Sequence, residues 1–164
     1  MGMNINSENQ AFALELVHCV MKRYCLSYSP FELRTMDWRN MKRRFTPTIR
    51  EAVRIMVPRF TNFNFSTFRD SGDTDEKRFQ HLVNTLFDTL FSNGYNEKEF
   101  LTFCIHVAKM ASRAFLHGVK KAPEFAVSAI LDSMEYFYTN LDLNEDSWDE
   151  LDRIANDIVI HNEL

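Results

Sequence analysis

Apolar residues recur at intervals of three and four along most of the chain, which is the spacing of one face of an α-helix. The first such stripe predicts a helix over residues 8–26, with Ser7 as its N-cap. Later stripes predict helices over residues 46–57, 79–91, 96–116 and 123–141, and a short last helix that starts at Ser147. Because the segments between them are also partly helical in pattern, we expect an all-α bundle of about seven or eight helices.

Residues that start and stop helices agree with these boundaries. Thr46-Pro47 combines a hydroxyl N-cap with a proline at the first helical position, where its missing N–H costs nothing. Pro58 should end or kink that helix, because proline inside a helix removes a hydrogen bond and clashes with the preceding turn. Gly118 is expected to close one helix and Pro123 to open the next.

Capping boxes are predicted at three helix starts. In this motif the N-cap side chain and the residue three positions later each bond the other's backbone amide. The predicted pairs are Asp73 with Glu76, Asn96 with Glu99 and Ser147 with Glu150.

The segment from Phe100 to Leu116 is the most apolar of the predicted helices, with twelve apolar residues among its seventeen. Its polar residues at helical spacing form one narrow stripe: Thr102, His106, Lys109 and Arg113. We therefore expect a central helix of a bundle that is wetted along this single edge. A membrane-inserting hairpin is the alternative, but two basic residues make it costly.

A loop over residues 27–45 joins the first two long helices. Its length is unusual in a compact domain and indicates function or mobility, although part of it can be helical. The basic run Lys42-Arg43-Arg44 is interpreted as a solvated loop, in preference to a phosphate or localisation patch.

Length and charge limit the classes of function. With 164 residues, the chain is expected to form a single helical-bundle domain over residues 1–164. A net charge of −4 argues against nucleic acid as a partner. The charge is uneven: eight basic residues lie between positions 34 and 59, and ten acidic residues between positions 132 and 164. Two solvated faces of opposite sign explain this most simply, and electrostatic steering of a partner is the alternative.

Nothing in the sequence predicts an enzyme, a metal site or a cofactor. Motifs such as CxxC, HExxH and GxGxxG are absent, and the five histidines show no ligand spacing. The odd count of three cysteines (Cys19, Cys25 and Cys104) fits a reducing compartment.

The sequence also carries no sign of secretion or of a membrane anchor. Its first residues lack a basic segment followed by an apolar stretch. No run approaches the ~20 apolar residues of a membrane span. We expect a cytoplasmic protein without a transmembrane anchor, with a peripheral position at mitochondria as the alternative.

Phenylalanine is in surplus near the middle of the chain. Phe60, Phe63, Phe65 and Phe68 lie in one short segment that cannot bury four rings by itself. In a soluble chain, such a surplus can mark a hydrophobic groove for a partner helix, although an aromatic stripe belongs more often to the core.

The order of these segments resembles that of the Bcl-two (B-cell-lymphoma-two) family of apoptosis regulators. "FQHLVNTLF" (79–87) is similar to the helix that leads into the family's first homology region, and "NGYNEKEFLTF" (93–103) occupies the place of that region. "SWDEL" (147–151) resembles the second homology region, with Trp148 and Asp149 at the start of a short helix. The resemblance spans nearly the whole chain, and a short, divergent member without a tail is most similar to the viral survival proteins.

The resemblance implies a bundle around the Phe100–Leu116 helix and a groove on its surface. Such a groove holds the amphipathic death motif, or BH-three helix, of pro-apoptotic Bcl-two proteins, so the implied function is inhibition of apoptosis. The residues implied for the groove are Val53, Met56, Phe60, Phe63, Leu86, Leu90, Asn96, Glu99 and Leu101.

The chain departs from the family at the start of the central helix. Asn96 matches the family's asparagine, but Glu97, Lys98 and Glu99 stand where the family has Trp, Gly and Arg. That arginine normally pairs with an aspartate of the bound helix, which Glu99 would repel. The resemblance therefore implies restricted selectivity, with Lys98 or Arg54 as the candidate replacement cation.

Two further interpretations remain open. A Bcl-two fold can serve as an immune-signalling interaction module, or form a homodimer in which the two grooves occlude each other. Either would be a protein-interaction module without sequestration of death-motif helices.

Overall fold

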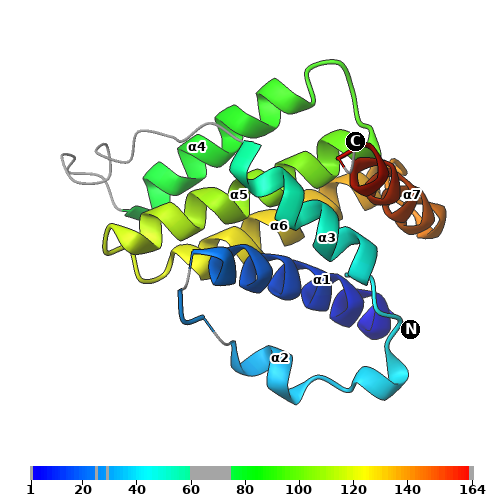
Figure 1. The fold of residues 1–164 in the computed structure, drawn as a ribbon, viewed down its shortest axis with the longest axis horizontal. Coiled ribbons are helices and arrows are strands. Elements are labelled where there is room, and N and C mark those ends of the chain that lie inside the picture. Colours follow the sequence, from blue (N-terminus) through cyan, green and yellow to red (C-terminus); the bar gives the residue numbers. More distant parts are fainter. Residues whose placement is uncertain (1, 25, 29, 60–74, 163–164) are drawn as a thin grey trace.

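The computed structural model describes residues 2–24, 26–28, 30–59 and 75–162, and this part of the chain contains helices and no strand (Figure 1). Its α-helices are α1 Gly2–Arg23, α2 Phe31–Thr35, α3 Pro47–Met56, α4 Asp75–Leu90, α5 Glu97–Leu116, α6 Ala122–Thr139 and α7 Glu145–Asn162. Two 3-10 turns are η1 Trp38–Asn40 and η2 Val57–Arg59. The expectation of an all-α protein is confirmed, with seven α-helices in the described residues.

Helix α5 lies at the centre of the bundle. It packs against α1, α4, α6, α7 and η2, and twelve of its twenty residues are buried (Figure 1). The apolar segment from Phe100 onward therefore forms the middle of the core, as its composition predicts.

Helix α1 begins earlier than its stripe suggested. It starts at Gly2, so Ser7 lies inside the helix and the prediction of an N-cap at Ser7 is wrong. No proline or glycine interrupts residues 3–7, and extending an existing helix by a turn costs little. Phe12, Leu16 and Val20 of α1 are fully buried, and α1 packs mainly against α5 and α6.

The predicted caps at the starts of α3 and α5 are present. The Thr46 hydroxyl accepts a hydrogen bond from the Ile49 N–H at 3.1 Å, with Pro47 in the first turn. The Asn96 side chain accepts the Glu99 N–H at 2.8 Å. Each cap satisfies one of the amide groups that a helix start leaves without a partner.

Helix α7 starts before the predicted position. Asn144 is its N-cap, because its side chain accepts the Asp146 N–H at 2.9 Å. The Ser147 hydroxyl accepts the Asn144 N–H at 3.0 Å and so plays the second role of a capping box. The helix therefore begins at Glu145, which corrects the prediction of a start at Ser147, and it is 18 residues long. Asp73, the N-cap predicted for α4, lies outside the described residues.

Proline and glycine end two helices as expected. Helix α3 stops at Met56, and the chain continues as the 3-10 turn that contains Pro58. At the end of α5, Gly118 has φ +98°, and the N–H of Val119 bonds the carbonyl of Ala114 at 3.0 Å. This is a Schellman ending, which requires a left-handed residue at the glycine position.

An aromatic cluster joins α4, α5 and α6. The ring centroids of Phe91 and Phe137 are 4.8 Å apart, those of Tyr95 and Phe137 4.5 Å, and those of Phe87 and Phe103 5.7 Å. Such pairs add to area burial and hold α4 on the bundle.

Candidate functional site

The α3 wall of the predicted groove consists of buried side chains. Val53 is fully buried and Met56 almost so, both on the face of α3 that turns into the bundle. Thr46 fixes where this face begins, because its cap sets the first turn of α3.

Helices α4 and α5 supply the other wall and the base. Leu86 and Leu101 are buried, and Leu90 is half-buried against the core. Val53 and Leu101 thus lie inside the core and are not open wall positions in this structure, whereas Met56, Leu86 and Leu90 lie closer to the surface. Phe60 and Phe63 lie outside the described residues.

Polar residues of the predicted site gather at the first turn of α5. Glu97 and Glu99 are half-buried and Asn96 and Lys98 are exposed. Negative side chains suit a helix start, because the helix dipole is positive there. Glu99 therefore has a local role at the helix start. Its contact with a ligand stays a prediction.

The two candidate cations for a ligand aspartate lie in different cavities. Lys98 lines a cavity of about 360 Å³ between η2, the start of α5 and the end of α7, together with Arg59 and Asp157. Arg54 instead pairs with Glu51 on its own helix and lines a cleft beside α1. Of the two cations, Lys98 is the one in the first turn of α5, next to Glu99 in sequence.

Lys109 corrects the expectation of a wetted stripe along α5. It is buried, with 5% of its surface exposed, and its ammonium donates a hydrogen bond to the Val57 carbonyl at 2.7 Å. Val57 follows the last turn of α3, where carbonyl groups lack helical partners and favour a cation. The stripe faces protein at this point because the end of α3 approaches α5.

His106 lies one turn before Lys109 and is half-buried. Burial, reinforced by the nearby charge of Lys109, lowers the pKa of His106 to about 4. The imidazole is therefore neutral at pH 7.

Trp148 anchors the start of α7 in the core. Its indole N–H donates to the Tyr138 hydroxyl at 2.9 Å, and its ring meets Phe12 at a centroid distance of 5.0 Å. Asp149, its predicted companion, is exposed. In this structure Trp148 thus joins α1, α6 and α7.

Arg44 links the first helix, α1, to the last helix, α7. It pairs with Glu8 of α1 at 3.0 Å and with Glu145 of α7 at 2.6 Å, and it lies over the Trp148 ring. Only 4% of its side chain is exposed. The interpretation of Lys42-Arg43-Arg44 as a solvated loop is wrong for Arg44, and we refer to Arg44, Glu8, Glu145 and Trp148 as the Arg44 junction.

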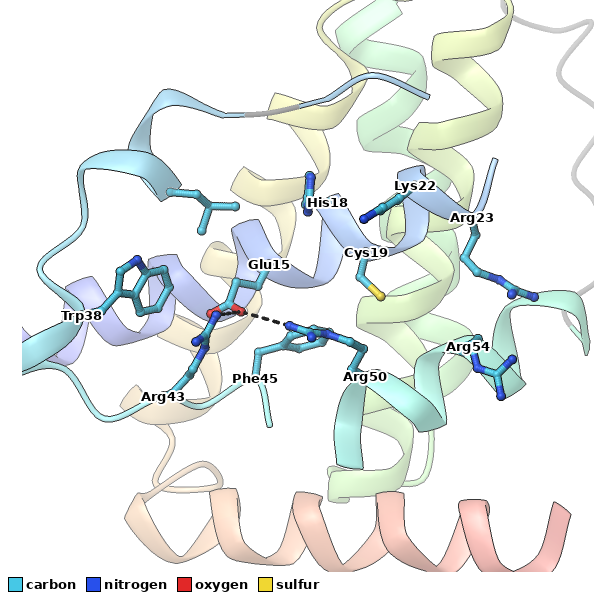
Figure 2. Close-up of a pocket in the computed structure, with 11 residues that line it drawn as sticks. Glu15, His18, Cys19, Lys22, Arg23, Trp38, Arg43, Phe45, Arg50 and Arg54 are labelled. Carbon is cyan, nitrogen blue, oxygen red and sulfur yellow. Dashed lines mark hydrogen bonds and ion pairs between the residues drawn. The ribbon is translucent and has the colours of Figure 1, made fainter. Parts of the chain in front are cut away.

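A basic cleft, which the sequence did not predict, lies between α1, the α2–η1 segment and α3 (Figure 2). Its volume is about 690 Å³, and we call it the α1–α3 cleft. Five cations and one carboxylate line it: Lys22, Arg23, Arg43, Arg50, Arg54 and Glu15. The sequence signals were the excess of basic residues between positions 34 and 59 and the spacing of four between Arg50 and Arg54, which places that pair on one helix face.

Comparison of the chain with models of protein families, with curated proteins and with solved structures finds no match. Among the described helices, none combines the length and the apolar character needed to cross a bilayer. In the same residues, no group of three or more His, Cys, Asp or Glu side chains is placed to hold a metal ion.

Proposed function

We propose that the protein inhibits apoptosis by holding the BH-three helix of pro-apoptotic Bcl-two proteins in a groove between α3 and α4, over α5. It acts in the cytoplasm or at the mitochondrial surface. One observation carries the proposal: α5 is a buried central helix that both α4 and the end of α3 approach, while α3 and α4 make little contact with each other. This arrangement suits recognition of an amphipathic helix by a hydrophobic groove.

Local features add support. The segment "NGYNEKEF" leads into α5 with Asn96 as its cap, and the Trp148 segment lies in the first turns of α7. Both stand where the resemblance to the Bcl-two family requires them in chain order. Glu99 at the rim gives the groove a sign opposite to that of the family, so the bound helix is expected to lack an aspartate at that point or to hold it near Lys98.

Calorimetry against a panel of BH-three peptides tests the proposal. We expect at least one peptide to bind with a Kd below about 10 μM, which corresponds to roughly −7 kcal/mol. A panel in which every peptide binds more weakly would remove the sequestering mechanism. Sedimentation of the free protein shows, in addition, whether a homodimer competes with the peptides.

The variant Glu99→Arg tests whether position 99 lies beside the aspartate of the bound helix. We expect peptides with the usual aspartate to bind about 10-fold more tightly, a change of about 1.4 kcal/mol, because the new guanidinium pairs with that carboxylate. The matched control is Glu97→Arg, which makes the same charge change in the same first turn but on the opposite side of α5. Equal gains in the two variants would mean that general charge, and not the position of Glu99, controls binding.

A further inference from the structure

The α1–α3 cleft concentrates positive charge in a protein whose net charge is −4. Lys22 and Arg23 come from the last turn of α1, Arg43 from the loop, and Arg50 and Arg54 from one face of α3 (Figure 2). Cations from the end of α1 and from the loop and helix α3 that follow later in the chain therefore line one space.

Acidic groups compensate only part of this charge. Glu15 at the base of the cleft pairs with Arg43 at 3.1 Å and with Arg50 at 3.9 Å (Figure 2). Glu51, outside the cleft, pairs with Arg54. Within the described residues, no ion pair forms at Lys22 or Arg23. The five cations of the cleft thus have one carboxylate inside it and one outside it as partners, which leaves a net positive charge.

The positive charge of the cleft affects the pKa values of two neighbouring side chains, His18 and Cys19. Burial lowers the pKa of His18, and the charges of Lys22 and Arg50 lower it further. Burial raises the pKa of the Cys19 thiol, whereas Arg50, Arg23 and Lys22 oppose that shift. Both side chains therefore experience the combined field of cations from α1 and α3.

Two of the guanidinium groups are held in place before any ligand binds. Arg43 stacks over the Trp38 ring at 4.6 Å, and Arg50 lies over the Phe45 ring at 5.6 Å. Both also share the Glu15 carboxylate on the inner side. More than half of each arginine side chain is nevertheless exposed, so N–H groups remain available on the side of the cleft. Pre-orientation of this kind reduces the entropy lost on binding.

We propose that the α1–α3 cleft binds a compact organic polyphosphate, either free or as the headgroup of a phosphorylated lipid. Planar guanidinium groups match phosphate oxygens in pairs, and lysine adds a point charge. A volume of about 690 Å³ falls within the range of small-molecule sites. The acidic remainder of the chain disfavours a long nucleic acid, which would extend far beyond the cleft.

The experiment is calorimetry of the full chain with inositol hexakisphosphate at about 150 mM salt, where non-specific attraction is screened. We expect a 1:1 complex with a Kd in the micromolar range. The variant Lys22→Gln/Arg23→Gln removes two exposed cations without disturbing an ion pair, and we expect it to weaken binding about 10-fold or more. Arg50→Gln, which removes a guanidinium from the centre of the cleft, serves as a second variant with the same expectation.

The matched control is Lys120→Gln/Lys121→Gln, which removes two exposed cations that do not line the cleft and form no ion pair in the described residues. We expect it to leave the Kd within about 2-fold of the parent. Equal weakening in cleft and control variants, or no binding by the parent at 100 μM as an approximate upper limit, would overturn the proposal.

Vesicles distinguish the two sources of phosphate. Phosphatidylcholine vesicles with and without a phosphatidylinositol bisphosphate are sedimented with the protein. Pelleting that depends on the phosphorylated lipid and is reversed by inositol hexakisphosphate assigns a headgroup, and binding of the soluble compound alone assigns a free ligand. Binding of an acidic peptide at the cleft without binding of the polyphosphate would overturn the proposal. The cleft variants should still bind BH-three peptides, so this inference and the proposed function can fail separately.

Discussion

Arg43 and Arg44 are neighbours in the loop before α3, yet they belong to two very different regions. Arg44 is 4% exposed and meets Glu8, Glu145 and Trp148 in the Arg44 junction. Arg43 is 58% exposed and stands at the edge of the α1–α3 cleft. The same residue type stabilises the fold in the first region and adds to an excess of charge in the second.

The difference lies in how completely each charge is compensated. In the junction, one guanidinium reaches two carboxylates from α1 and α7, so the cost of burial is offset by charge-assisted hydrogen bonds. In the cleft, Glu15 is shared by two arginines, and Lys22 and Arg23 stay at the surface. Position relative to other helices, and not residue type, separates a structural cation from one available to a ligand.

The largest expected effect is at the junction. Arg44→Met should lower the free energy of unfolding by about 3 kcal/mol, because Glu8 loses its main partner while it remains mostly buried. Urea denaturation measures this value. Lys42→Met removes a charge from an exposed side chain of the same loop and should change the free energy by less than about 0.5 kcal/mol. Similar losses in the two variants would contradict the expectation that the buried Arg44 stabilises the fold more than the exposed Lys42.

The next effect concerns the pH dependence of the free energy of unfolding, to which His106 contributes. Its pKa is about 4 in the folded chain, against an ordinary value of 6.5, so the unfolded chain binds more protons between these values. The stability that His106 contributes is complete above pH 6.5 and is lost as the pH falls through 4, by about 1–2 kcal/mol once screening of the partly exposed ring is included. Urea denaturation at several pH values, for the parent and for His106→Gln, should show a flatter profile in the variant.

The comparison of the parent with His106→Gln is needed because the pKa of Glu15 also shifts on folding, in the opposite direction. Burial raises the pKa of the Glu15 carboxyl, although Arg43 opposes the shift, so the folded chain holds this proton more tightly than the unfolded chain. Acid therefore strengthens folding through Glu15 and weakens it through His106. Parallel profiles of the parent and of His106→Gln would contradict the lowered pKa of His106.

An effect smaller than that at the junction is expected at Lys109. Lys109→Met should lower the free energy of unfolding by about 1–2 kcal/mol, because the Val57 carbonyl loses a charge-assisted bond while the side-chain volume is retained. Lys98→Met, at an exposed position of the same helix, is the control for urea denaturation. A gain in stability at Lys109 would mean that burying the ammonium costs more than its hydrogen bond returns.

Local chemistry predicted much of the fold. Thr46, Asn96 and Gly118 act within four or five residues of their own positions, so the sequence around each was sufficient to place a helix end. The start of α7 was wrongly predicted at Ser147 for the same local reason, because Asn144 is an equally good N-cap one turn earlier.

The site was harder to predict, because it depends on which helices meet. Nothing near Lys109 in sequence indicates that the end of α3, 52 residues away, covers it. Arg44 is likewise 101 residues from Glu145. The cations of the α1–α3 cleft are spread from residue 22 to residue 54, and only the packing of α1 beside α3 brings them together.

Helix α3 is attached to α7 at both of its ends. Thr46 donates a hydrogen bond to Asp152 at its start, and Arg59 bonds Asn162 just beyond its end. Between these points, α3 and α7 form the most extensive helix pair of the described chain. A displacement of α3 would therefore disrupt its contacts along α7, so the α3 side of the proposed groove is expected to be the more rigid one. In the proposed groove, α4 is therefore the wall expected to adjust to a bound helix, because it packs less extensively than α3 on the rest of the described chain.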